Sequence, residues 1–157
     1  WPATIPAGSC CHQPICLGDF MATCAEIVDA DIPENAGEDS VSFFSLLKGE
    51  TEAPTREVVV HHSVDGRFAI RKGDWVFIDS PTGDTNGEPE WFKHERGYRS
   101  HDYPAELYNL SDDLSERINR YADKPEIVEE LSAILKRVKE GNEPQKAQHT
   151  RPPQHWA

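Results

Sequence analysis

Apolar residues in two stretches of the chain recur every three or four positions, the spacing that gathers them on one face of a helix. The first stretch contains Leu17, Phe20, Met21, Cys24, Ala25 and Val28, and the second contains Ile127, Leu131, Ile134, Leu135 and Val138. Each pattern predicts an amphipathic helix whose apolar side packs in a core. A third, short helix is expected to begin at a Ser40 cap, run through Leu47 and end at Gly49.

Four shorter stretches are rich in β-branched and aromatic residues, as strands are. They cover residues 57–63, 67–72, 74–79 and 106–109. Asp65-Gly66 joins the first two and predicts a two-residue hairpin turn. A sheet of this size needs a helix over one face, and the long helix after Pro125 can supply it. The pattern therefore predicts an α+β fold: a small antiparallel sheet of about four strands packed by a long C-terminal helix.

The predicted turn also fixes the partners of two adjacent histidines. A two-residue turn places His61 opposite Ile70 and His62 opposite Ala69. Because side chains alternate between the faces of a strand, His61 then packs among apolar neighbours while His62 shares the other face with Arg71. The two histidines cannot chelate a metal by adjacency. The combination of His62 with a cationic neighbour suits an anion.

Residues 80–104 form a long polar connection that contains several aromatic residues, namely Trp91, Phe92, Tyr98 and Tyr103. Connections of this length are uncommon in small domains unless they have a function. The aromatic residues either stack on a sugar or anchor the loop, and anchoring is the favoured interpretation.

All four cysteines lie near the start of the chain, at Cys10, Cys11, Cys16 and Cys24. Their spacing differs from the paired C-x2-C of zinc sites, although the neighbouring His12 leaves a metal cluster conceivable. The alternative is that Cys16 and Cys24 are small core residues.

The charge balance excludes some functions. Lys and Arg number 16 against 28 Asp and Glu, a formal net charge of −12. Binding to nucleic acid or to an anionic membrane needs a cationic surface, so neither is expected. No apolar run approaches the roughly 20 residues of a membrane span. The chain also lacks a phosphate-binding glycine loop, a G-x-S-x-G elbow and an H-E-x-x-H motif.

Five segments, in order along the chain, resemble motifs of one enzyme family, the type I, arylsulfatase-like sulfatases. Trp1-Pro2 with Ile5-Pro6-Ala7-Gly8 resembles R-W-P-G-x-I-x-x-G, and QPICLGDFMATCAEI (13–27) resembles the D-x-x-P-T helix region. NAGEDSVSFFSLLKG (35–49) is similar to G-x-S-x-x-x-L-L-x-G, and HHSVDGRFAIRKGDW (61–75) is similar to G-x-x-A-I-R-x-G-x-W-K. ELYNLSDDLSERINR (106–120) resembles E-L-Y-D-L-x-x-D-P-x-E-x-x-N-L. The resemblance spans about residues 1 to 140 and implies a C-terminal fragment of a sulfatase.

The chain departs from the family pattern in three respects. Val76 stands where the family usually has Lys, and Leu114 stands where Pro is usual. The C/S-x-P/A-x-R motif, from which the family makes its formylglycine nucleophile, is absent from this sequence. The resemblance therefore implies that the parent enzyme carries formylglycine and Ca²⁺ upstream, and that this chain holds no catalytic residue, metal or cofactor.

The resemblance also implies a division of the chain. Residues 1–50 are expected to be the terminal segment of the main α/β domain, 51–140 the C-terminal subdomain of an alkaline phosphatase-like sulfatase, and 141–157 a flexible tail. Trp1 lies inside a family motif, so we expect a missing N-terminal catalytic domain against which residues 1–50 pack. The apolar side of the first helix should then be partly exposed, or covered by self-association with a second copy.

The implied function is hydrolysis of sulfate esters, on a sulfated carbohydrate or an aryl sulfate, by a periplasmic or secreted parent. The fragment alone is predicted to be inactive and to contribute structure and substrate recognition. The candidate substrate-binding residues are His62, Arg71, His61 and Trp91. Two alternatives stay open: a stand-alone, non-catalytic binding module, and a fragment of a related phosphodiesterase or phosphonate hydrolase.

Overall fold

The computed structural model describes residues 1–82, 89–95 and 97–141, and the chain divides into two compact units. The division falls between Glu57 and Val58. Apart from Gly141, the predicted flexible tail lies outside the described residues. Every helix in the described part is too short or too polar to cross a bilayer.

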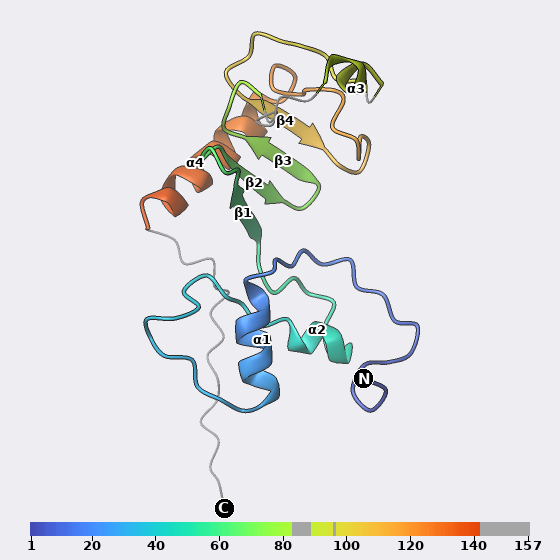
Figure 1. Ribbon diagram of the computed structural model, residues 1–157, viewed down its shortest axis with the longest axis vertical. Helices are drawn as coiled ribbons and strands as arrows, with labels where there is room; N and C mark the ends of the chain where they lie inside the picture. Colours follow the sequence, from blue (N-terminus) through green and yellow to red (C-terminus); the bar gives the residue numbers. More distant parts are fainter. Residues whose placement is uncertain (83–88, 96, 142–157) are drawn as a thin grey trace, which may run out of the picture. The chain divides into compact units, whose positions relative to one another are not determined.

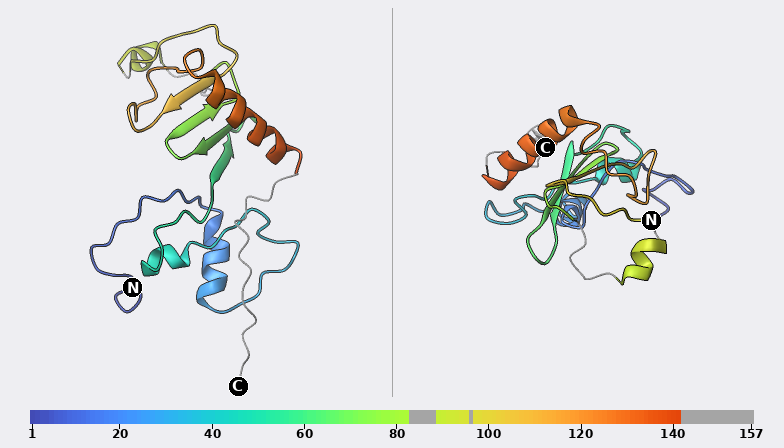
Figure 2. Two further views of the ribbon diagram at one scale, coloured as in Figure 1. Left: turned by 180° about the vertical axis from the view of Figure 1, so that it is seen from behind. Right: turned by 90° about the horizontal axis from the view of Figure 1, so that it is seen from above.

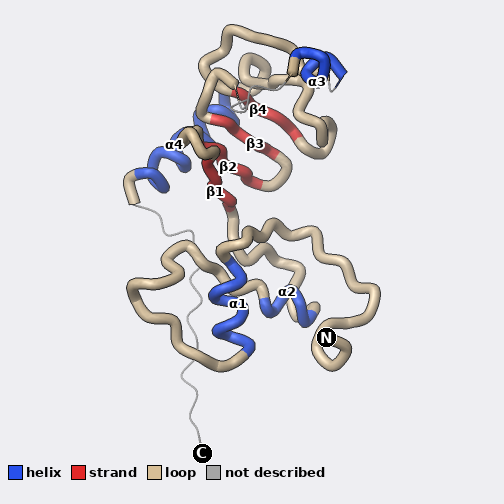
Figure 3. The backbone as a smooth tube through the Cα atoms, in the orientation of Figure 1, coloured by secondary structure: helices blue, strands red, loops and turns tan. Residues whose placement is uncertain are grey.

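The second unit is a four-stranded antiparallel sheet with the strand order β1-β2-β3-β4 (Figures 1 and 3). Its elements are β1 (Val58–His62), β2 (Phe68–Lys72), β3 (Trp75–Ile78), α3 (Glu90–Glu95), β4 (Glu106–Asn109) and α4 (Pro125–Lys139). Helix α4 lies across one face of the sheet, as the view from behind in Figure 2 shows. The predicted α+β fold, with its four strands and long C-terminal helix, is confirmed. Helix α3 falls in the connection 80–104, where the sequence analysis predicted no helix.

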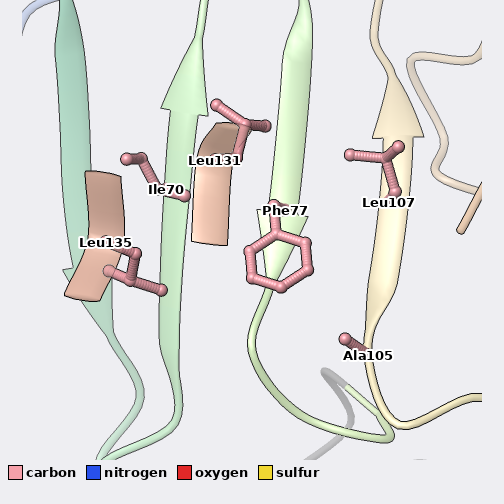
Figure 4. Close-up of a cluster of buried hydrophobic side chains, with 6 residues drawn as sticks. All are labelled: Ile70, Phe77, Ala105, Leu107, Leu131 and Leu135. Carbon is pink, nitrogen blue, oxygen red and sulfur yellow. The ribbon is translucent and has the colours of Figure 1, made fainter. Parts of the chain in front are cut away.

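The core of this unit joins the sheet to α4. Ile70, Phe77 and Leu107 point from three strands toward Leu131 and Leu135 of the helix (Figure 4). All five side chains are buried. Each stabilises the fold by about 1.5–3 kcal/mol relative to an exposed position. The apolar positions of the helix, spaced by about 3.6 residues, and those of the strands, spaced by 2, therefore form one shared apolar layer.

The ends of α4 follow the predicted signals. Pro125 occupies the first turn, where its missing N–H costs no hydrogen bond, and Gly141 has a positive φ of 71° after the last turn. Lys139 places its ammonium 4.5 Å from the Phe68 ring centroid and 2.7 Å from Asp79 Oδ2. These exposed contacts add little stability compared with the apolar layer.

The first unit contains two helices, α1 (Asp19–Ile27) and α2 (Phe44–Lys48). The residues that α1 buries are polar: Asp19 and Thr23. The Asp19 carboxylate pairs with Arg56, and both side chains are fully buried. Asp19 also accepts hydrogen bonds from the backbone N–H groups of Cys16 (2.9 Å) and Val41 (3.1 Å). This ion pair links three separate stretches of the unit, as a buried charge must be compensated by a partner and by hydrogen bonds.

Ser40 does not cap α2, so that prediction is wrong. Its hydroxyl donates to Gly18 O (2.7 Å) and accepts from Ala22 N (2.9 Å), which ties the loop before α2 to the first turn of α1. Helix α2 begins only at Phe44. Its predicted end is confirmed, because Gly49 adopts the left-handed conformation (φ 69°) that closes a helix.

The apolar stripe of α1 does not form a core within the described residues. Phe20 is 50% exposed and Met21 46% exposed. Phe20 keeps one aromatic contact, an edge-on packing against Phe43 at 5.2 Å. The prediction of a packed stripe is therefore wrong for this chain, while the partial exposure that the sulfatase resemblance implies is confirmed. The stripe failed as a core because the unit buries the opposite, polar side of the helix around Arg56.

Candidate functional site

The β1–β2 hairpin carries three of the four candidate residues, and its loop has three residues. The N–H of Ser63 donates to Arg67 O (2.9 Å), and the N–H of Gly66 donates to Ser63 O (2.9 Å). Gly66 has φ 75°, whereas Asp65 is not among the residues with positive φ. A two-residue type I′ turn would require positive φ at both positions, so the geometry is that of a type I turn followed by a left-handed glycine.

The longer loop shifts the register by one residue from the predicted one. His62 lies opposite Phe68 and His61 opposite Ala69. The predicted partners, Ala69 for His62 and Ile70 for His61, are therefore wrong. A one-residue shift moves every side chain of a strand to the other face of the sheet.

The shift reverses the environments of the two histidines. His62 is on the face that α4 covers, with its ring 5.4 Å from the Phe68 ring and its Nδ1 2.9 Å from Ser63 O. His61 shares the other face of the sheet, the face away from α4, with Arg71, because Arg71 pairs with Val59, two residues before His61. Ala69, Val76 and Tyr108 are buried on that face. Both histidines are exposed. The predicted pairing of His62 with Arg71, and the predicted packing of His61 among apolar residues, are corrected accordingly.

Arg71 is a half-buried cation on the same face as His61. Its Nε donates to Gly73 O at 2.9 Å, which orients the guanidinium along the strand. An arginine stays charged across the physiological range and offers several fixed donors, as recognition of a sulfate group requires. His61 lies on the same face, on the neighbouring strand.

Trp91 lies on α3, on the β4 side of the sheet, while the histidines lie on β1 at the opposite edge (Figure 1). Its side chain is 66% exposed and packs edge-on against Phe92 at 5.7 Å. The favoured interpretation, that it anchors the connection, is wrong for Trp91. Tyr103 fits that interpretation instead, since its ring stacks on Tyr121 at 5.7 Å.

A buried polar cluster, which the sequence analysis did not identify, lies around Glu106 on the face away from α4. This residue is 2% exposed. Its Oε1 is 3.1 Å from His101 Nε2 and 3.5 Å from the Tyr98 hydroxyl. The carboxylate thus accepts from side chains of the connection before β4, which compensates its burial.

Tyr108, two residues after Glu106 on the same strand, also belongs to this cluster. Burial disfavours the charged phenolate, and the neighbouring Glu106 charge and hydrogen bond disfavour it further, so the pKa of Tyr108 is raised well above its ordinary value. Its hydroxyl therefore remains a proton donor toward Glu106. The alternation in ELYN, with Leu107 on the core face, was the available signal, because it sets both Glu106 and Tyr108 on the opposite face.

The described residues offer no group of three or more His, Cys, Asp or Glu side chains placed to hold a metal ion. Cys24 is exposed and Cys16 half-exposed, so their predicted role as core residues is wrong. The Ca²⁺ and formylglycine that the sulfatase resemblance implies do not fit the part of the chain that the structure describes.

No family model matches the chain. It is 35% identical over 121 residues to an N-acetylgalactosamine-6-O-sulfatase of Bacteroides thetaiotaomicron, a match that covers 77% of this chain and 22% of that protein. A solved structure from work on the metabolism of multiple glycosaminoglycans by Bacteroides thetaiotaomicron is 34% identical, with a TM-score of 0.60 over 78% of this chain and 24% of the other.

A second solved structure, a complex with its substrate D-glucosamine-2-N,6-O-disulfate, shares the fold at 18% identity. Its TM-score is 0.62, and the match covers 94% of this chain and 29% of the other. The sheet and its covering helix thus define the α+β fold of a sulfatase C-terminal subdomain. The chain belongs to the sulfatases and corresponds to a C-terminal part of such an enzyme. It spans about a fifth of the length of the curated relative that it matches.

The three-residue loop can be tested by substitution at two adjacent positions. Gly66→Ala should lower the free energy of unfolding by about 1–2 kcal/mol, because alanine is strained at positive φ. Asp65→Ala should change it by less than about 0.5 kcal/mol. Chemical denaturation of both variants measures the difference. Equal losses at the two positions would indicate the two-residue turn instead.

Proposed function

We propose that the parent protein, the full-length sulfatase to which this chain corresponds in part, hydrolyses sulfate esters of a carbohydrate. The observation that carries the proposal is the 35% identity over 121 residues with a sulfatase. The name of that relative makes the 6-O-sulfate of N-acetylgalactosamine the first substrate to test. Aryl sulfates serve as minimal substrates.

In this proposal the bond-breaking groups lie outside the chain. The family's formylglycine and Ca²⁺ supply the nucleophile and the positive charge that sulfate transfer needs. The residues of this chain bind and orient the substrate rather than cleave it. Its isolated form is therefore expected to release no sulfate.

We assign substrate recognition to His61 and Arg71, on the face of the sheet away from α4. Arg71 and His61 share that face, and the guanidinium of Arg71 can donate two hydrogen bonds to one sulfate group or sugar carboxylate. His62 lies on the α4 face, which gives it a smaller part in recognition. Trp91 is the candidate for stacking on a sugar ring, because its indole is exposed and a sugar presents apolar C–H faces.

We also propose that the N-terminal catalytic domain of the parent covers the apolar side of α1. Phe20 is 50% exposed and Met21 46% exposed, more apolar surface than a helix of a folded enzyme usually leaves in water. The match to only 22% of the relative leaves a large domain to supply that cover. A second copy of the chain is the alternative occupant.

Sulfate release by the purified parent tests the function. We expect turnover of N-acetylgalactosamine 6-sulfate and of an aryl sulfate, and none of the corresponding phosphate diesters. Preferred hydrolysis of phosphate diesters or phosphonates would favour the related hydrolases. Binding of the sulfated sugar without turnover would favour a non-catalytic module.

Substitutions on the hairpin test the recognition site. In the parent, Arg71→Ala and His61→Ala should each raise KM for the sulfated sugar by about tenfold, the loss expected for one charge-assisted hydrogen bond. Their effect on an aryl sulfate, which lacks the rest of the sugar, should be smaller. His62→Ala is the matched comparison on the other face. A larger effect at His62 than at His61 would contradict the assignment.

Substitution of Phe20 tests the cover over α1. Phe20→Ser should lower the stability of the parent by about 2–4 kcal/mol, because it removes a ring from a packed interface, and should change the isolated chain much less. Val64→Ser, at a residue 91% exposed at the hairpin tip, is the control. Thermal unfolding of both forms measures this. Dimerisation of the isolated chain that Phe20→Ser abolishes, with no loss in the parent, would support the second copy instead.

A further inference from the structure

Two side chains of the stretch that follows α3, Tyr98 and His101, reach the buried Glu106 of β4. His101 Nε2 is 3.1 Å from Glu106 Oε1, and the Tyr98 hydroxyl is 3.5 Å from the same oxygen. The Tyr98 hydroxyl is also 3.5 Å from Thr82 Oγ1, and Arg67 Nη1 donates to Thr82 O at 2.8 Å. Residues 97–101 are therefore held to β4 through one buried carboxylate.

The His101 ring can make its two hydrogen bonds in only one neutral form. Its Nδ1 accepts from the backbone N–H of Tyr103 at 3.2 Å, so the ring proton is on Nε2 and points at Glu106. The ring is almost buried, with 9% of its side chain exposed, and lies 5.5 Å from the Tyr103 ring. This arrangement fixes the orientation of the chain as it returns to β4.

Helix α3 has little packing of its own. None of its six residues is buried. Trp91 and Phe92 are 66% and 41% exposed and pack against each other. A helix of this length is marginal in water without tertiary contacts. The N–H groups of Gly97 and Tyr98 donate to His94 O (3.1 Å) and Lys93 O (2.9 Å) of the helix. The orientation of Trp91 therefore depends on how this following stretch is held.

We propose that Glu106 and His101 are positioning residues for substrate recognition: their hydrogen bond fixes residues 97–101, which follow α3, so that Trp91 is presented to a sugar ring of the sulfated carbohydrate. The inference rests on the proposed function. Glu106 is buried among donors from Tyr98, His101 and Tyr108, so it acts through α3 and not by touching the substrate. The aromatic pair on α3 is the surface that meets the sugar.

The experiment uses the full-length parent with 5-fluorotryptophan incorporated, and its fluorine NMR signal for Trp91 assigned by Trp91→Phe. His101→Phe removes the donor to Glu106 while keeping a ring. His101→Gln is the conservative variant, since its amide can still donate. Tyr98→Phe removes one hydroxyl only and guards against a variant that fails to fold.

We expect His101→Phe to move the Trp91 fluorine signal toward that of the free amino acid and to raise KM for N-acetylgalactosamine 6-sulfate by about tenfold. The kcat for an aryl sulfate should stay within about twofold of wild type, because the bond-breaking groups are untouched. His101→Gln should restore most of both readouts. Tyr98→Phe should produce the same changes in smaller measure.

An unchanged fluorine signal in His101→Phe and Tyr98→Phe would overturn the inference, and so would a shifted signal with an unchanged KM. An equal loss of activity on the aryl sulfate would also overturn it, because it would indicate a general structural role. A wild-type parent that releases no sulfate would instead overturn the proposed function. The fluorine signal and the affinity for the sulfated sugar would then still decide whether Glu106 and His101 position Trp91.

Discussion

The packing of α4 on one face of the sheet is the constraint on which the second unit depends. Leu131 and Leu135 close that face over Ile70 and Phe77, so alternate residues of every strand are committed to the core. The remaining positions, including His61, Arg71 and Glu106, are thereby committed to the face away from α4. Apolar residues such as Ala69 and Val76 are buried on the same face, so only part of it meets water.

Buried ionisable groups organise the two units in the same way. In the first unit, Asp19 and Arg56 are fully buried and draw hydrogen bonds from the stretches around them. In the second unit, the Glu106 carboxylate accepts hydrogen bonds from His101 and Tyr98. Removal of one partner from such a pair leaves an uncompensated charge, at a cost of about 3–5 kcal/mol. These groups therefore select one arrangement of the loops, which apolar contacts alone would leave less defined.

The sequence predicted the elements better than their contacts. Periodicity identified the four strands and α4, because each pattern is local and long enough to read. The register of the hairpin was wrong by one residue, because Asp65-Gly66 fits both a two-residue and a three-residue loop and only the φ of Asp65 separates them. The first helix was predicted with the wrong side inward. Its buried residue Asp19 pairs with Arg56, which is distant in sequence. Hydrophobic periodicity does not predict such a pair.

The candidate site was predicted as a set of residues but not as an arrangement. His61, Arg71 and Trp91 are on the surface in the structure. The faces of His61 and Arg71 follow from the corrected register, and the position of Trp91 follows from α3, which the sequence analysis missed. Glu106 stood in a quoted motif without an assigned role. Its burial is compensated by His101 and Tyr98. These residues lie in a long connection, and sequence patterns do not predict that they come close to Glu106.

Hydrogen–deuterium exchange of the full-length parent, with and without bound sulfated N-acetylgalactosamine, tests the central claim most directly. The claim is that this chain supplies substrate recognition to a sulfatase whose bond-breaking groups lie elsewhere. The account predicts slower exchange on binding in the β1–β2 hairpin, residues 58–72, and in α3, residues 90–95. Slower exchange confined to the rest of the parent, with both segments unchanged, would contradict it.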